Sequence, residues 1–369
     1  MSIFEKQLRG FDWLFFFAII ILSAIGVMMI YSTGLGSRGA DSGLWVRQLA
    51  FVGVGLAGFF FLSTLDYRFF RKNSSVIYLL AVIMLVAVLL FGVQIRGSTR
   101  WFDLGFFNFQ PAELSKLALI VLLAKYFQVQ RPFLKKFRFV ILSFAYAALP
   151  AILIMRQPDL GSALVLFAIW GGMLLFSPVP KRYLLYLLII FLIVSAVSWN
   201  FVLHDYQKDR VHTFLEPTLD PQGRGYNVIQ SMVAIGSGGL GGRGLARGLQ
   251  SQLRFLPERQ TDFIFASTVE ELGLLGGALI LLCLGFMLFR IIAILRRTPD
   301  TFGAGLAAGI FFLFLSQAVI NIGMNLGLLP VTGITLPFVS YGGSSLMIML
   351  WVAGIVESLA INSAPVRFR

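Results

Sequence analysis

The run DWLFFFAIIILSAIGVMMIYST at residues 12–33 decides the fold class. After Asp12 it carries no charge, and it is long enough to cross the roughly 30 Å hydrocarbon core of a bilayer as one helix. It is too long for the apolar core of a cleavable signal and lacks a small-residue exit site. We therefore predict a first membrane span that stays in place.

Nine further apolar runs follow along the chain, at 47–64, 75–93, 111–128, 138–155, 160–177, 182–203, 263–292, 303–328 and 341–361. The composition agrees, because 58% of the residues are hydrophobic and only 13% are charged, where a soluble protein carries about a quarter. The sequence predicts an all-α polytopic membrane protein of about ten transmembrane helices. We expect residues 1–369 to form one integral membrane domain.

The positive charges indicate the orientation. Outside the long segment 204–262, seventeen Lys and Arg side chains fall in loops on one side of the predicted spans and five on the other. Cytoplasmic loops carry such an excess. We therefore expect both termini in the cytoplasm and the segment 204–262, between the seventh and eighth helices, outside it.

Several functions are excluded by what the charges and motifs lack. The net charge of +13 comes from loops between spans, without a basic amphipathic helix, so no nucleic-acid partner is expected. Cys283 is the single cysteine, which leaves no disulfide framework or zinc motif. Gly236 to Gly241 fits GxGxxG but has no strand–helix context, so we interpret it as a close-packed turn.

Charges within the predicted spans are costly and therefore informative. Glu113 and Lys116 lie three residues apart on one helix face. They either form an ion pair that fixes the helix or line the polar floor of an outward cavity. Asp159 is placed to cap a helix. Gln317, Asn321 and Asn325 form a polar stripe that we interpret as interhelical hydrogen-bonding glue.

Two loops at the outer face could complete a site. In the string LPERQTDF (256–263), Asp262 stands where the chain re-enters the membrane. Partial desolvation there would raise its pKa and make it a better base, although Arg259 opposes this; helix capping is an equal alternative. The uncharged turn from Leu329 to Ser345, rich in Pro, Gly and Ser, could be a re-entrant segment that closes a cavity.

Long strings resemble the SEDS family of cell-wall polymerases. They include RWFDLGFFNFQPAELSK (100–116), RQPDLGSALV (156–165), QSQLRFLPERQTDFIFA (250–266) and NIGMNLGLLPVTGITLPFVSYGGSS (321–345). The resemblance covers nearly the whole chain, and the last string is closer to the elongation branch than to the division branch. It implies a glycosyltransferase that polymerises lipid II on the outer face of the bacterial cytoplasmic membrane during elongation and rod-shape maintenance.

The resemblance also implies roles for individual residues. Asp262 matches the essential aspartate of the family and is our candidate base for the acceptor 4-hydroxyl, in a transfer that inverts the anomeric centre. The candidate substrate-binding residues are Glu113, Lys116, Asp159, Arg100, Arg210, Glu258, Arg259, Ser340 and Ser344. Lys116 and the arginines would offset charge on the leaving pyrophosphate.

Cofactors and partners are expectations of the same kind. A divalent cation such as Mg²⁺ could share that charge, but the sequence shows no dedicated metal cage. The expected partners are lipid II, the growing glycan strand, a class B penicillin-binding protein with transpeptidase activity, and the elongation machinery. The alternatives are a lipid II flippase, whose path the charges in the spans would line, and a scaffold that positions cell-wall synthases.

Overall fold

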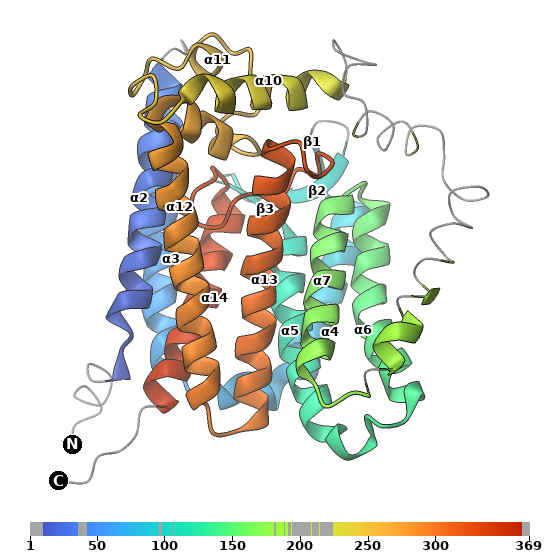
Figure 1. Ribbon diagram of the computed structural model, residues 1–369. Coiled ribbons are helices and arrows are strands. Elements are labelled where there is room, and N and C mark those ends of the chain that lie inside the picture. The colour runs from blue at the N-terminus through green and yellow to red at the C-terminus, as the bar shows by residue number, and fades with distance from the viewer. Residues whose placement is uncertain are drawn as a thin grey trace, which may run out of the picture.

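The computed structural model describes residues 10–35, 43–95, 98–105, 107–180, 182–187, 189–190, 193, 208, 214 and 224–363. Its long helices stand side by side as a bundle (Figure 1). They are α2 (Trp13–Leu35), α3 (Leu44–Thr64), α4 (Arg68–Phe91), α5 (Pro111–Val129), α6 (Phe137–Arg156), α7 (Leu160–Phe176), α12 (Ile264–Arg297), α13 (Thr301–Asn325) and α14 (Gly343–Ser363).

Within the described residues, seven of these helices are long and apolar enough to cross a membrane. The other two, α5 and α7, occupy the predicted spans 111–128 and 160–177. The predicted span 182–203 lies largely outside the described residues, so the count of ten stays a prediction. The chain is a multi-pass membrane protein, because large apolar side chains such as Leu79, Leu90 and Phe91 are exposed on the bundle surface, as lipid-facing residues are.

The core lies around α5 and α14, which are apolar on nearly all sides and are buried accordingly. Helix α14 packs on α3, whereas α5 packs against α4, α7 and α13. Near the start of α2, Gly10 lies against the backbone of Ile361 at the end of α14. The start of α2 and the end of α14 therefore lie at the same face of the bundle, as an even number of spans requires.

A small sheet departs from the all-α prediction. Strands β1 (Val93–Ile95), β2 (Ser98–Asp103) and β3 (Asn108–Phe109) pair antiparallel in the order β1-β2-β3, with Val93 opposite Trp101 and Phe102 opposite Phe109. The strands have only two to six residues, too few for an alternating apolar pattern to reveal them. The sheet lies beside the start of α5.

The described part of segment 204–262 packs against the helices of the bundle. Helix α10 (Arg224–Gly238) lies across the end of the bundle (Figure 1), where it contacts α12 and α13. Its Val228 and Ala234 are buried. A short helix, α11 (Leu249–Gln252), follows.

Two acidic residues of α12 anchor this segment. Glu270 accepts hydrogen bonds from the backbone N–H groups of Gln250, at 2.7 Å, and Ser251, at 3.0 Å. Glu271 accepts from the N–H of Ala246 at 3.1 Å and from the hydroxyl of Ser32 on α2. Both carboxylates fall within the predicted span 263–292. They are buried against protein donors instead of lipid.

Candidate functional site

A cavity of about 700 Å³ opens at the end of the bundle opposite the basic loops. Its wall combines the small sheet, the first turns of α5 and α7, the turn before α12 and the loop before α14. The lining residues are Arg47, Phe51, Ser98, Arg100, Trp101, Asp103, Gly105, Phe107, Asn108, Gln110, Glu113, Asp159, Ser162, Thr261, Asp262, Gly333, Ile334, Thr335, Tyr341, Gly342, Gly343, Ser344 and Ser345. Five predicted site residues are brought together there: Asp262, Glu113, Asp159, Arg100 and Ser344.

Asp262 is half-buried at the edge of this cavity. It does not cap α12, because the helix begins at Ile264 and its N-cap position is Phe263. The backbone carbonyl of Asp262 accepts hydrogen bonds from Nδ2 of Asn321 and Nδ2 of Asn325, each at 2.9 Å. Its carboxylate lies next to Gly333. A Cβ atom added to Gly333 would stand 3.8 Å from Oδ2 of Asp262. The polar stripe of α13 thus fixes the main chain and leaves the carboxylate at the cavity edge.

The loop before α14 holds the turn that carries Asp262. The hydroxyl of Ser340 donates to the carbonyl of Thr261 at 2.6 Å, and the N–H of Tyr341 donates to the carbonyl of Gln260 at 2.8 Å. Thr261 also donates through its hydroxyl to Glu258 Oε2 at 2.9 Å. These bonds give Asp262 a defined position between two loops that are about 80 residues apart in sequence.

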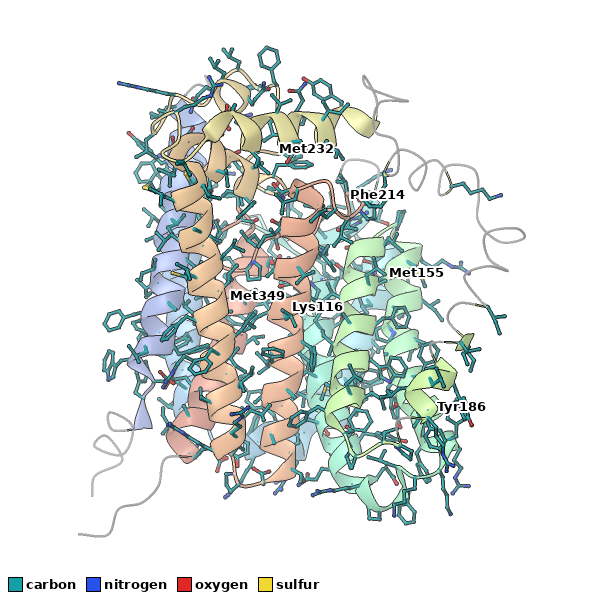
Figure 2. The ribbon with its side chains drawn as sticks, in the orientation of Figure 1. Lys116, Met155, Tyr186, Phe214, Met232 and Met349 are labelled. Atoms are coloured by element: carbon teal, nitrogen blue, oxygen red, sulfur yellow. The ribbon has the colours of Figure 1, made fainter. Side chains whose placement is uncertain are left out.

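Glu113 lies on the floor of the cavity, and Lys116 lies beneath it. Lys116 Nζ donates to Glu113 Oε1 at 2.6 Å, and the lysine is 0% exposed (Figure 2 shows it inside the bundle). Among the described groups, Glu113 Oε2 has no hydrogen-bond partner, and Glu113 also lines the cavity. The two interpretations made from the sequence therefore hold together: the residues are an ion pair, and the glutamate faces the cavity.

Asp159 both caps a helix and lines the cavity. Its Oδ1 accepts from the N–H of Ser162 at 3.0 Å, which caps α7. Its Oδ2 accepts from Gln110 Nε2 at 3.2 Å and lies 3.6 Å from the guanidinium of Arg100. Arg100 also donates through Nε to the carbonyl of Gln157 at 2.8 Å, so it ties β2 to the start of α7.

Four of the predicted substrate contacts do not line the cavity. Lys116 lies beneath Glu113, Ser340 is buried in the loop contact described above, and Glu258 accepts from Thr261. Arg259 is buried, and its Nε donates to the carbonyl of Thr33 on α2 at 3.4 Å. A fifth residue, Arg210, lies outside the described residues.

Sequence reasoning missed Arg47, Asp103 and Tyr341, which line the cavity from α3, β2 and the loop before α14. Burial raises the pKa of Tyr341, and the guanidinium of Arg47, hydrogen-bonded to its hydroxyl, opposes that shift. Tyr341 is therefore a neutral hydroxyl donor at neutral pH. The available signal was Tyr341 itself, an aromatic hydroxyl within the otherwise small-residue string 340–345.

The carboxylates of the cavity do not form a metal cage. Within the described residues no three His, Cys, Asp or Glu side chains lie close enough to hold one ion. Glu113 is paired with Lys116, and Asp159 lies beside Arg100. The expectation that an ion such as Mg²⁺ assists the reaction stays a prediction, and no step below passes through a metal.

Comparison of the sequence with known proteins identifies relatives that match nearly the full length of the chain. A family model for FtsW, RodA and SpoVE, described as "Cell cycle protein", matches residues 12–364. The peptidoglycan glycosyltransferase MrdB of Escherichia coli K12 is 38% identical over 337 residues, which cover 90% of each chain. The stage V sporulation protein E of Bacillus subtilis is 39% identical, and the match covers 95% of this chain and 96% of that one.

Solved structures share the fold. A chain from a peptidoglycan synthase complex, described as coordinating polymerization and crosslinking, matches with a TM-score of 0.80 and 34% identity, over 96% of this chain and 98% of that one. The rod shape-determining protein RodA of Thermus thermophilus matches with a TM-score of 0.70 and 28% identity, over 95% and 96%.

Proposed function

The chain belongs to the FtsW/RodA/SpoVE family of cell cycle proteins, and on this premise we propose that it is a peptidoglycan glycosyltransferase that polymerises lipid II. The match to MrdB, which bears that activity in its name, spans nine tenths of both chains. The structural match to RodA and the string 329–345 support a role in elongation and rod shape. Sequence identity does not separate the branches, because this chain is 38% identical to MrdB and 39% identical to the sporulation protein.

The observation that carries the proposal is the position of Asp262. A carboxylate with a fixed main chain lies at the edge of a cavity of about 700 Å³ that also contains Glu113, Asp159 and Arg100. The cavity lies at one end of a membrane bundle, where a polyprenyl tail can stay in lipid while its sugar enters the polar space. That arrangement suits a lipid-linked sugar donor.

In the proposed reaction, Asp262 accepts the proton of the acceptor 4-hydroxyl as the oxygen attacks the anomeric carbon of the donor. The glycosidic bond forms on the face opposite the departing pyrophosphate, so the configuration inverts. Arg100 and Arg47, which line the cavity, are placed to offset the charge that develops on the pyrophosphate. Among the other candidates, Ser344 lines the cavity, whereas Glu258, Arg259 and Ser340 hold the surrounding loops.

The site lies on the outer face in this proposal. The chain is a multi-pass protein of the inner membrane, and its basic loops lie at the end of the bundle opposite the cavity. Since basic loops mark the cytoplasmic side, the cavity faces away from the cytoplasm. This places the reaction where lipid II is joined to the growing glycan strand.

We also propose that the chain works with a class B penicillin-binding protein. Support comes from the structural match to a chain of a peptidoglycan synthase complex over 96% of this chain. Such a partner would crosslink the glycan strands that this chain polymerises.

The test is polymerisation of purified lipid II by the full chain and by Asp262→Asn, which keeps the size of the side chain. We expect folded, membrane-inserted variant protein that makes no glycan. Glycan synthesis by the variant at the wild-type rate would overturn the assignment of the base, whereas absence of glycan synthesis by the wild-type chain would favour the scaffold alternative. Scrambling of labelled lipid II in liposomes without polymer would instead favour the flippase.

A further inference from the structure

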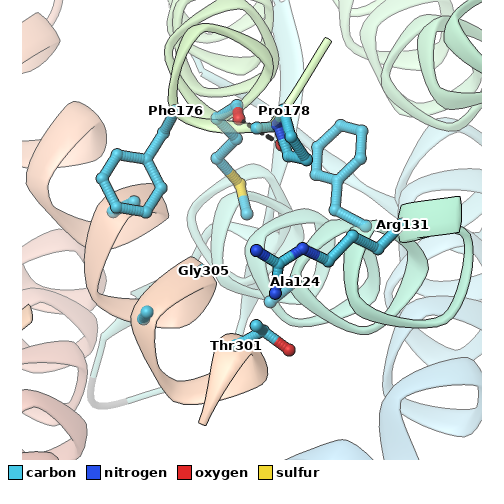
Figure 3. Close-up of a pocket in the computed structure, with 11 residues that line it drawn as sticks. Ala124, Arg131, Phe176, Pro178, Thr301 and Gly305 are labelled. Atoms are coloured by element: carbon cyan, nitrogen blue, oxygen red, sulfur yellow. Dashed lines mark hydrogen bonds between the residues drawn. The ribbon is translucent and has the colours of Figure 1, made fainter. Parts of the chain in front are cut away.

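A second cavity, of about 120 Å³, lies at the opposite end of the bundle from the first. It is enclosed by the C-terminal ends of α5 and α7 and the first two turns of α13 (Figure 3). The residues that line it are Ala124, Phe127, Arg131, Met173, Phe176, Ser177, Pro178, Thr301, Ala304, Gly305 and Ala308. None of them takes part in the site described above.

Small side chains create this space. Ala304, Gly305 and Ala308 present almost no side-chain volume from α13, and Ala124 faces them from α5. A Cβ atom on Gly305 would stand 3.4 Å from the Cα of Ala124, so the two helices nearly touch at that level. Small residues allow such close approach of membrane helices.

One cation enters the cavity. The side chain of Arg131, which begins the short 3-10 helix η2 (Arg131–Phe133), extends over the cavity toward Ala124 and Thr301 (Figure 3). The lining contains no carboxylate, and no ion pair to Arg131 occurs within the described part of the chain.

The nearest acidic residue in sequence to this lining is already engaged. Asp300 accepts hydrogen bonds from the hydroxyl of Tyr67, at 2.5 Å, and from the N–H of Gly303, at 3.3 Å. Burial and this contact raise the pKa of Tyr67 to about 12, which keeps its hydroxyl protonated as the donor. Asp300 therefore has its own partners and does not neutralise Arg131.

Apart from the hydroxyl residues Ser177 and Thr301, the rest of the lining is apolar, and its surroundings face lipid and a basic surface. Phe176 is 50% exposed beside the cavity, as Leu175 and Phe133 also are to a similar extent. Lys135 and Lys136 follow Phe133 before α6, and Arg138 lies in the first turn of that helix. A cation above apolar walls, at the membrane face with most positive charge, matches an amphiphile with an anionic head.

We propose that this cavity binds the phosphate headgroup of an anionic phospholipid from the cytoplasmic leaflet. Arg131 pairs with the phosphate, the hydroxyl of Thr301 is placed to donate to it, and Phe127 and Phe176 contact the start of the acyl chains. Basic pockets between membrane helices on the cytoplasmic side bind anionic lipids in this way.

The experiment is native mass spectrometry of the purified full chain in detergent, titrated with dioleoylphosphatidylglycerol or with dioleoylphosphatidylcholine. We expect one retained phosphatidylglycerol with a clear preference over phosphatidylcholine. Arg131→Gln should weaken its retention about tenfold, as the loss of one charged hydrogen-bonding partner does. The control is Arg138→Gln, which removes the same charge from the first turn of α6, where Arg138 lies over the ring of Phe139 at 4.8 Å and outside the cavity.

A second variant separates the cavity from the charge. Ala304→Leu keeps Arg131 but fills the space, and it should also lower retention of phosphatidylglycerol. Equal losses in Arg131→Gln and Arg138→Gln would overturn the proposal, because they would show diffuse attraction to the basic face. Protection from thermal unfolding by inorganic phosphate that equals protection by phosphatidylglycerol, and is lost in Arg131→Gln, would also overturn it in favour of a free-phosphate site.

Discussion

Asn321 joins the turn of the candidate base to the loop across the cavity. Its Nδ2 lies 2.9 Å from the carbonyl oxygen of Asp262 and 2.7 Å from the carbonyl oxygen of Ile334. Both carbonyls belong to residues that line the cavity, and Asn321 is 0% exposed. One carboxamide on a membrane helix therefore fixes the distance between two irregular segments, one of which presents Asp262.

Replacing Asn321 by Leu should lower polymerisation more than it lowers stability. Two buried carbonyls lose a donor, which costs about 1–2 kcal/mol in a membrane helix bundle. Since a displacement of about 1 Å at a reacting group costs about 100-fold in rate, we expect kcat to fall far more than the unfolding temperature suggests. Thermal unfolding in detergent and glycan synthesis from lipid II measure the two effects.

The matched control is Gln317→Leu, one helical turn earlier on the same stripe. Gln317 is buried, and neither polar atom of its side chain has a hydrogen-bond partner within the described structure. Its replacement by an apolar residue should be neutral or stabilising. Equal loss of activity in both variants would show that α13 tolerates no change, and the positioning role of Asn321 would lose its support.

The helices could be predicted from the sequence because an apolar run is local information. The run 111–128 became α5 at Pro111–Val129, and 138–155 became α6 at Phe137–Arg156. Helix α4, however, begins at Arg68 rather than at 75, because its first turns carry Arg71 and Lys72 at the membrane edge and interrupt the apolar pattern. The small sheet was missed because its strands, of two to six residues, are too short to show an alternating apolar pattern.

The site was predicted only in part, because tertiary contacts that no local sequence pattern shows bring its residues together. Asp262, Glu113 and Asp159 stand in distinctive strings, and the structure brings all three to one cavity. Arg259 is a near neighbour of Asp262 in sequence, yet its side chain lies toward α2, because the backbone is sharply bent at Glu258, immediately before Arg259, with φ +50°. Arg47 comes from a distant helix, and only the tertiary fold places it at the cavity.

Removing one partner of the buried ion pair should be more damaging than removing both. Lys116→Met leaves the carboxylate of Glu113 without its cation in the bundle interior, which costs about 3–5 kcal/mol. The double variant Lys116→Met, Glu113→Gln removes both charges and should recover most of that loss. The unfolding temperature in detergent distinguishes them; equal temperatures for the single and double variants would contradict the pairing.

Capping and charge can be separated at Asp159. Asp159→Ser keeps a side-chain acceptor for the N–H of Ser162 but removes the charge beside Arg100, whereas Asp159→Ala removes both. We expect Ser to hold stability close to wild type and Ala to lose about 1 kcal/mol. If the charge serves the reaction, both variants should lose polymerisation to a similar extent. Full activity in Asp159→Ser would restrict the residue to its capping role.

Gly273 should not tolerate replacement by alanine, whereas Gly285 of the same helix should. Its φ of +70° and ψ of −169° interrupt α12, and a Cβ atom there would overlap the backbone of Gly242 and Leu240. Gly273→Ala therefore meets both backbone strain and a clash, together at least about 2 kcal/mol. The expected result is release of the segment that Glu270 and Glu271 anchor, seen as faster proteolysis at 239–256 in the folded protein.

Gly285→Ala is the control, because a Cβ atom there meets nothing within 4 Å and alanine favours a helix interior by about 0.5–1 kcal/mol. Equal protease resistance of the two variants would show that α12 does not need its break at Gly273 to hold this segment against the bundle.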